Sequence, residues 1–232
     1  MQGAVKILND LQNLFFPGAC LCCRSLLPAP EQFICVKCRH HLPLTDFTNR
    51  RDNATERIFQ GRFRLEEATS LLWFHKKGPV QNLIHQLKYR GHQKAGEYLG
   101  HWLGEEIRLS SRFKDIDLVI PMPLQPKKLR KRGYNQTEKF ASALAEHLTV
   151  AYRNDLLRRT DRSTSFSLRG RIKRVMESQP LFEANTPELR RYKHVLLTDD
   201  VITTGITLES AARAIQERSG IKVSFATIAI TA

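Results

Sequence analysis

The segment 195–207 constrains the fold of this chain more than any other part of the sequence. An apolar run at 195–197 leads into the adjacent acids Asp199 and Asp200, and a stretch rich in threonine and glycine then opens an amphipathic region. The apolar run fits a strand that is buried on both faces, and the amphipathic region fits a helix that follows at once. Such strand–turn–helix units are typical of a parallel sheet covered by helices, so the segment predicts an α/β fold.

The turn between this strand and this helix has the composition of an anion-binding loop. Backbone amides at a helix N-terminus and threonine hydroxyls can donate to one phosphate, and glycine lets the backbone approach it closely. The two acids cannot serve the phosphate, because like charges repel, and they suit sugar hydroxyls or Mg²⁺ instead. A phosphate next to a ribose therefore fits the segment. The candidate binding residues are Asp199, Asp200, Thr203, Thr204, Gly205, Ile206 and Thr207.

Apolar patterns elsewhere extend the alternation of strands and helices. Strands are expected at 68–74, 116–122 and 223–230, and helices at 4–16, 80–87, 98–107, 136–148 and 208–218. A polar stretch separates the cysteine-containing N-terminal part from these elements. We therefore expect an N-terminal helix and cysteine ribbon at 1–44, a linker at 45–61, and the α/β domain at 62–232.

All five cysteines fall within residues 20–38. Two C-x2-C pairs can supply four thiolates to one tetrahedral Zn²⁺, and a set of four sulfur ligands predicts a structural site because no position is left for water. Cys22 is then surplus, although an exchange with Cys23 and a ligand from His40 or His41 stay open. Reduced thiols or a disulfide are the alternative interpretation. The predicted ligands are Cys20, Cys23, Cys35 and Cys38.

Positive charge is concentrated in two segments of this chain of 232 residues. Residues 127–132 carry +5 and residues 158–174 carry +6, so the two segments hold +11 of the net charge of +14. Runs of a single sign favour an anionic partner over a merely solvated surface. A hydrophobic content of 41% excludes a disordered chain. No run of about 18 apolar residues suits a membrane span, and no signal peptide is recognisable, so we expect a cytoplasmic protein.

The segment 195–207 resembles the phosphoribosyl pyrophosphate (PRPP) motif of type I phosphoribosyltransferases. The resemblance implies that the paired acids hold the ribose hydroxyls, that the threonine-rich loop holds the 5-phosphate, and that Mg²⁺ accompanies the ligand. It also implies that the loop after the strand at 116–122 binds pyrophosphate. The implied pyrophosphate residues are Pro123, Leu124, Lys127, Lys128, Arg130 and Arg132.

Thr203 departs from one branch of that family. Members acting on 6-oxopurines often carry an aspartate here that faces the base, whereas threonine matches orotate-type and amido-type members. The threonine disfavours nucleobase salvage and removes the obvious general base. We therefore predict no catalytic residue, and phosphoribosyl transfer is the expected reaction only if the protein is an active enzyme.

Nearly the whole chain resembles a more specific family. The cysteine cluster is followed by L-K-Y-R-G at 87–91, by P-x-P-L at 121–124, by R-G-Y-N-Q at 132–136, and then by the motif at 195–207. This order is similar to the ComF/ComFC/GntX family of phosphoribosyltransferase-like competence proteins. The resemblance implies a cytoplasmic protein of natural transformation and DNA uptake that binds PRPP and handles imported single-stranded DNA.

Two functions from different classes stay open. One is a PRPP-binding protein or enzyme of DNA uptake, and the alternative is a nucleic-acid-binding adaptor with a catalytically idle phosphoribosyltransferase fold. A DNA-uptake helicase or a recombination-loading protein is a further expected partner. Cations that neutralise phosphates and an aromatic ring that stacks on bases would serve either role. The candidate nucleic-acid residues are Lys127, Lys128, Tyr134, Arg169, Arg171, Lys173 and Arg174.

Overall fold

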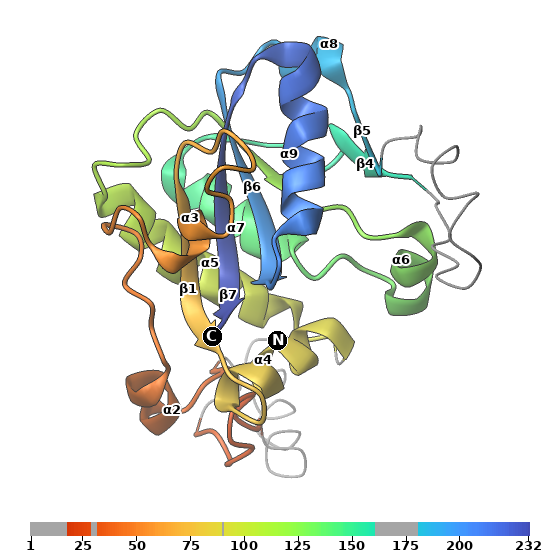
Figure 1. The fold of residues 1–232 in the computed structure, drawn as a ribbon. Helices are drawn as coiled ribbons and strands as arrows, with labels where there is room; N and C mark the ends of the chain where they lie inside the picture. Colours follow the sequence, from red (N-terminus) through yellow and green to blue (C-terminus); the bar gives the residue numbers. More distant parts are fainter. Residues whose placement is uncertain (1–17, 29–31, 90, 161–180) are drawn as a thin grey trace, which may run out of the picture.

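A five-stranded sheet forms the centre of the computed structural model (Figure 1). The strand order is β1-β7-β6-β2-β3, and every neighbouring pair runs parallel. This arrangement confirms the predicted α/β fold with a mainly parallel sheet. The strands are β1 (Ala68–Phe74), β2 (Leu118–Pro121), β3 (Ala151–Tyr152), β6 (His194–Ile202) and β7 (Lys222–Thr231). The structure describes residues 18–28, 32–89, 91–160 and 181–232.

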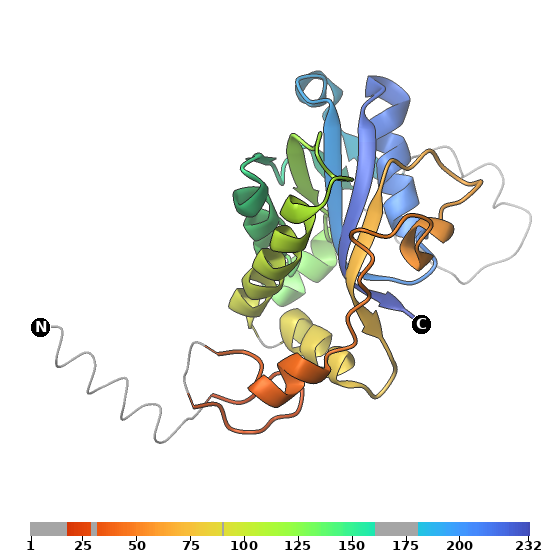
Figure 2. The same ribbon diagram turned by 90° about the vertical axis from the view of Figure 1, so that its left-hand side faces the viewer.

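Helices cover both faces of the sheet (Figure 2). One apolar cluster joins α4, α5 and α7 to the face that carries Leu196, and a second joins α9 to the face that carries Leu197. The two leucines are neighbours in the chain and point to opposite faces, as successive strand residues do. The helices are α4 (Pro79–Tyr89), α5 (Gln93–Leu109), α7 (Glu138–Leu148) and α9 (Ile206–Ser219).

The first basic segment was expected to lie in a loop, but most of it is helical. Residues Pro126–Arg132 form the short helix α6, which begins at a proline and ends at Gly133 with a φ of 78°. Proline is preorganised for the first helical position, and glycine tolerates the left-handed conformation that ends a helix. Seven helical residues therefore stand between β2 and the turn that leads to α7.

The predicted linker 45–61 contains α3 (Ala54–Arg57) and packs against the sheet. Phe47 and Phe59 are almost fully buried in the second apolar cluster. The side-chain amide of Asn53 caps α3 and donates a hydrogen bond of 2.9 Å to the carbonyl oxygen of Ala68 in β1. The stretch is thus a fixed part of the sheet edge, and the domain boundaries stay predictions.

Three further small elements lie near α9. β4 (Leu157–Arg159) pairs antiparallel with β5 (Phe182–Ala184), and α8 (Thr186–Leu189) follows. Phe182 belongs to the same apolar cluster as the buried face of α9. This packing fixes the position of β4 relative to the end of β6.

The cysteine-containing part lies beside α4 and includes α2 (Val36–His41) (Figure 2). Leu21 and Ile34 belong to the first apolar cluster, and Asn82 of α4 donates a hydrogen bond of 2.8 Å to the carbonyl oxygen of Cys22. The predicted helix at 4–16 lies outside the described residues. Among the described helices, none has the length and hydropathy of a membrane-crossing segment.

Candidate functional site

The candidate ligand residues gather at the carboxyl end of β6, a central strand of the sheet. Asp199 and Asp200 belong to the strand itself, and the loop 203–205 connects it to α9. In open α/β sheets the crevice at the carboxyl ends of the strands is the usual ligand site. The backbone therefore brings the acids and the loop into the arrangement that the sequence predicted.

Gly205 shapes the loop. Its φ of 73° is left-handed, and it caps α9, a helix of 14 residues. A Cβ at this position would lie 2.6 Å from Cε1 of Phe59, so no larger residue fits. Thr203 and Thr204 are exposed, and together with Thr207 they line a cavity of about 40 Å³. The loop thus offers amides, hydroxyls and the positive end of a helix dipole to a small anion.

Arg62, from a distant part of the chain, makes hydrogen bonds that hold this loop in place. Its Nη1 donates hydrogen bonds of 2.9 Å to the carbonyl oxygens of Ile58 and Thr204, and its Nη2 pairs with Glu209 in the first turn of α9. Nothing in the sequence indicates this contact, because Arg62 and Thr204 are 142 positions apart. The contacts of Arg62 fix the loop backbone relative to α3 and α9.

Asp200 is buried, and each of its two carboxylate oxygens has a partner. The ammonium group of Lys88, at the end of α4, lies 2.9 Å from its Oδ1. The side-chain amide of Gln136, just before α7, donates a hydrogen bond of 2.6 Å to its Oδ2. Lys88 and Gln136 belong to sequence motifs already noted, yet the sequence assigned neither of them a partner.

Asp199 has a different environment. Its Oδ1 accepts a hydrogen bond of 2.8 Å from the backbone amide of Asp200. Burial, together with the negative charge of Asp200, raises the pKa of Asp199 to about 7, although Lys88 and Arg159 act in the opposite direction. The two neighbouring acids therefore differ in their hydrogen-bond and ion-pair partners.

Arg159, on β4, is the second cation near the acidic pair. Burial lowers the pKa of Arg159, and the charge of Asp199 opposes that shift. Its guanidinium lies over the ring of Phe182 at 5.4 Å, and its Nε is buried without a hydrogen-bond partner among the described residues. Arg159 belongs to the second basic segment, but it was not among the predicted site residues.

The short helix α6 presents an exposed cationic surface. Lys127, Lys128, Arg130 and Lys131 are exposed, and no ion pair joins them to any other described residue. Arg132 faces inward instead: its Nη1 donates to Gln136 at 2.8 Å, and its guanidinium lies 5.0 Å from the ring centre of Tyr89. Arg132 and Gln136 thus connect α6 to the carboxylate of Asp200.

The residues after α6 hold the backbone around the site. The hydroxyl of Tyr134 donates to the carbonyl oxygen of Leu87 at 2.6 Å and accepts from the amide of Gly91 at 3.1 Å. The side-chain amide of Asn135 donates to the carbonyl oxygen of Met122 at 3.0 Å. Tyr134 therefore connects Leu87, near the end of α4, with Gly91, shortly before α5. Its neighbour Tyr89 has an exposed aromatic ring.

Part of the second basic segment cannot be placed. The candidate nucleic-acid residues Arg169, Arg171, Lys173 and Arg174 lie outside the described residues. Pro123 and Leu124 lie one residue beyond β2 and are half-buried.

The four predicted metal ligands come together in space. The sulfur atoms of Cys20, Cys23, Cys35 and Cys38 all lie within 4.8 Å of one another. Sulfur atoms in a tetrahedral zinc site with Zn–S bonds of about 2.3 Å are about 3.8 Å apart. The sulfur atoms of Cys23 and Cys35 are 3.8 Å apart. The cluster therefore has dimensions that suit a single Zn²⁺.

The structure also distinguishes Cys22 from Cys23. The Cys22 side chain is buried, burial raises the pKa of its thiol to about 12, and it is not part of the cluster. None of the five cysteines, all of them within the described residues, forms a disulfide. The second C-x2-C pair opens a helix: Cys35 caps α2, and the amide of Cys38 lies 3.4 Å from its sulfur. Such amide–sulfur contacts are typical second partners of metal thiolates.

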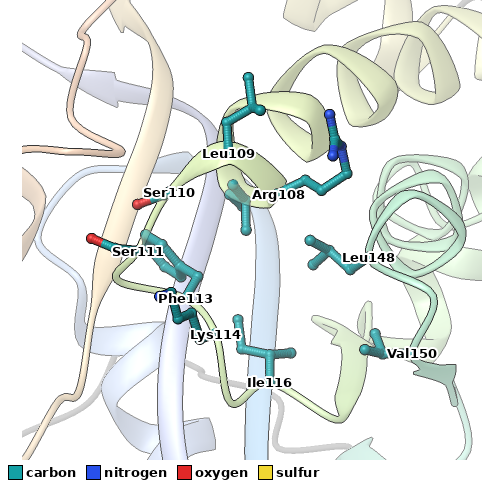
Figure 3. Close-up of a pocket in the computed structure, with 10 residues that line it drawn as sticks. Arg108, Leu109, Ser110, Ser111, Phe113, Lys114, Ile116, Leu148 and Val150 are labelled. Atoms are coloured by element: carbon teal, nitrogen blue, oxygen red, sulfur yellow. The ribbon is translucent and has the colours of Figure 1, made fainter.

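A separate cavity of about 380 Å³ lies where α5 ends and β3 begins (Figure 3). Its walls are apolar side chains such as Phe113, Ile116 and Leu148, and Arg108 and Lys114 also line it. It contains none of the site residues that the sequence predicted.

Comparisons with known proteins agree with this geometry. The sequence profile of the phosphoribosyl transferase domain matches residues 137–230, a range that includes the acids and the loop. The chain is 24% identical over 212 residues to Competence protein F of Haemophilus influenzae, which covers 88% of this chain and 93% of that protein. It is 27% identical over 140 residues to DNA utilization protein YhgH of Salmonella typhimurium, covering 58% of this chain and 60% of that protein.

Two further similarities are more limited. Competence protein ComFC of Streptococcus pneumoniae is 26% identical over 138 residues, which cover 60% of this chain and 57% of that protein. The glutamine PRPP amidotransferase of B. subtilis, complexed with ADP and GMP, superposes with a TM-score of 0.43 at 15% identity over 62% of this chain and 30% of that one. The named relatives, together with the match to the phosphoribosyl transferase domain, support the ComF/ComFC family for this chain.

Proposed function

We propose that this protein serves competence or DNA utilisation and binds PRPP or a related phosphoribosyl ligand at the carboxyl end of β6. The names of its relatives support the biological role. One observation carries the proposed ligand: the acidic pair, of which Asp200 is buried and Asp199 half-buried, adjoins the Gly205 loop at the N-terminus of α9. An anion-binding loop beside carboxylates suits a molecule that joins a phosphate to sugar hydroxyls.

The individual parts of the ligand match different parts of the site. The 5-phosphate would bind the amides and hydroxyls of Thr203, Thr204 and Thr207, and the ribose hydroxyls would meet the acids. The pyrophosphate would face the half-buried Pro123 and Leu124 and the cations of α6. Mg²⁺ would accompany the pyrophosphate, because phosphate and carboxylate oxygens are its preferred ligands.

Titration calorimetry with PRPP and Mg²⁺ tests the proposal. We expect the wild-type protein to bind, and we expect the double variant Asp199→Ala/Asp200→Ala to lose binding. The matched control is Asp115→Ala/Glu146→Ala, which also removes two negative charges but alters exposed residues away from the site. No binding by the wild-type protein, or equal binding by the acidic-pair variant, would contradict the proposal.

We also propose that α6 contacts single-stranded DNA. The supporting observation is its row of exposed cations, Lys127, Lys128, Arg130 and Lys131, with no acid in the helix to oppose them. A protein that neutralises phosphates of single-stranded DNA binds more weakly as salt rises, with a slope of about −0.7 per phosphate contact. The same surface would face the pyrophosphate, so the two ligands would share cations.

The salt dependence of binding to labelled single-stranded DNA tests this second role. Lys127→Ala/Lys128→Ala should reduce the slope of log K against log salt by about 1.4, the value for two lost contacts. Arg190→Ala/Lys193→Ala is the control, because these exposed cations precede β6 at the opposite edge of the sheet. If both variants reduce the slope equally, α6 contributes no more to binding of single-stranded DNA than the control cations do.

A further inference from the structure

We propose that the ring of Tyr89 stacks on an unpaired base of single-stranded DNA whose phosphates lie along α6. This inference rests on the proposed contact between α6 and DNA, and it adds a group that meets a base rather than a phosphate.

The first argument concerns the exposure of the ring. Tyr89 is the last residue of α4 and is 56% exposed. Among the phenylalanine, tyrosine and tryptophan side chains that the structure describes, it alone is exposed. Tyr134, by contrast, is half-buried, and its hydroxyl bonds two backbone groups. The ring of Tyr89 therefore offers the flat, open surface on which a base can stack.

The second argument concerns how firmly the ring is held. The guanidinium of Arg132 lies 5.0 Å from the ring centre, and its Nη2 donates a hydrogen bond of 3.4 Å to the Tyr89 hydroxyl. The ring of His85, one turn earlier in α4, is 5.0 Å away. Tyr134 also bonds the backbone on both sides of Tyr89. A ring that is already held in place loses little freedom when a ligand stacks on it.

The third argument concerns the cations beside the ring. Arg132, which contacts Tyr89, is the last residue of α6. Lys128 lies four residues earlier in the same helix, so its side chain projects from the same side of α6 as that of Arg132. Lys128 is exposed to solvent and can meet a phosphate. A strand whose phosphates follow these cations would therefore pass beside the ring of Tyr89.

The combination of a ring and a row of cations selects the class of ligand. Every base has a face that can stack on a ring, so stacking tolerates any sequence. A free nucleotide has the same stacking chemistry, but it cannot use several cations of α6 at once. We therefore assign the ring to a base within a strand and expect little sequence preference.

Fluorescence anisotropy with two labelled oligonucleotides tests the inference. One is a thymidine oligonucleotide, and the other is its abasic counterpart, which carries the same phosphates without bases. Tyr89→Ala should lower the affinity for the first about fivefold or more, as expected for one lost stacked base, and leave the affinity for the second unchanged. Tyr89→Phe and Tyr89→Trp keep an aromatic ring and should keep most of the affinity. Leu109→Ala is the control, because it removes an exposed apolar side chain at the end of α5.

The salt dependence separates stacking from phosphate contacts. Tyr89→Ala should leave the slope of log K against log salt unchanged, because the slope reports neutralised phosphates. Equal losses of affinity for the two oligonucleotides in Tyr89→Ala would mean that the ring only positions Arg132, and would overturn the inference.

The remaining outcomes distinguish this inference from the proposal on which it rests. A wild-type protein that does not bind the thymidine oligonucleotide would overturn the proposed contact with DNA. A wild-type protein that binds it as tightly as Tyr89→Ala does would overturn the present inference alone. Binding of thymidine monophosphate that requires Tyr89, with unchanged oligonucleotide binding in Tyr89→Ala, would assign the ring to a free nucleotide instead.

Discussion

Arg62 donates a hydrogen bond of 2.9 Å to the carbonyl oxygen of Thr204, and so joins the segment after α3 to the loop before α9. The same guanidinium bonds the carbonyl oxygen of Ile58 and pairs with Glu209, which also pairs with Arg213 at 3.0 Å. These contacts hold the backbone of the loop at the candidate anion site. The N-terminal part of the chain therefore helps to shape a site that the sequence locates in the C-terminal part.

Replacing Arg62 with alanine should lower the affinity for PRPP, because the loop amides lose their orientation. The loss of one partly exposed charged hydrogen-bond donor should also cost about 1 kcal/mol of unfolding free energy. Titration calorimetry and urea denaturation check the two effects. Arg64→Ala is the control, since the Arg64 side chain is 86% exposed and has one ion pair at 3.7 Å. Equal affinity for PRPP in both variants would show that the contacts of Arg62 do not influence ligand binding.

Gly205→Ala should destabilise the protein by about 2–4 kcal/mol, as left-handed backbone strain adds to a collision with buried Phe59. Gly220→Ala provides a matched control at the other end of α9. Its φ of 67° imposes the same strain, but no atom lies within 4 Å of the new Cβ. That control should lose only about 1 kcal/mol in the same urea titration. Equal losses of unfolding free energy in the two variants would mean that the loop rearranges to accommodate the extra methyl group.

Metal analysis should find about one zinc ion per chain, bound by the four clustered cysteines. Cys35→Ser should lose that metal and lower the melting temperature, because Leu21 and Ile34 beside the cluster belong to the main apolar core. Cys22→Ser should keep the metal, since Cys22 lies outside the cluster. Equal metal loss in both variants would show that the cluster has a different ligand set.

Stability should fall as pH rises from about 4 to about 7, in part because of Asp199. Its pKa is about 7 in the folded protein against 3.8 as the ordinary value, so the folded state binds more protons in this window. Folding is then penalised increasingly as pH rises, and the penalty is complete above pH 7. Urea denaturation at pH 5 and pH 8 should show that Asp199→Asn gains stability over the wild type at pH 8. A stability difference that does not vary with pH would contradict this.

The elements that were predicted correctly are those whose signal is local. β1 spans Ala68–Phe74, the range that its apolar run predicts, and β6 and α9 follow from one continuous segment. The cysteine cluster follows from spacing, because two C-x2-C pairs can reach one metal ion in few geometries. In each case the deciding residues are neighbours in the chain.

Features that the sequence does not reveal depend largely on contacts between distant residues. The stretch at 45–61 is polar in sequence, yet Phe47 and Phe59 bury their rings and Asn53 caps a helix against β1. Composition alone could not decide this case, because packing overrides local preference. The basic run at 127–132 is different: its charge predicts an exposed loop, but Pro126 and Gly133 mark the ends of a helix, and this signal is local.

By itself, the sequence of this protein determined the strand, the acids, the glycine loop and the cysteine spacing, since these are properties of short segments. Only the tertiary structure decided that Asp199 and Asp200 have different partners. Lys88 and Gln136 contact Asp200, and the charge of Arg159 acts on Asp199, from three separate segments of the chain. The physical reason is that these segments are far apart in the sequence, so only the folded chain decides which side chain meets which acid.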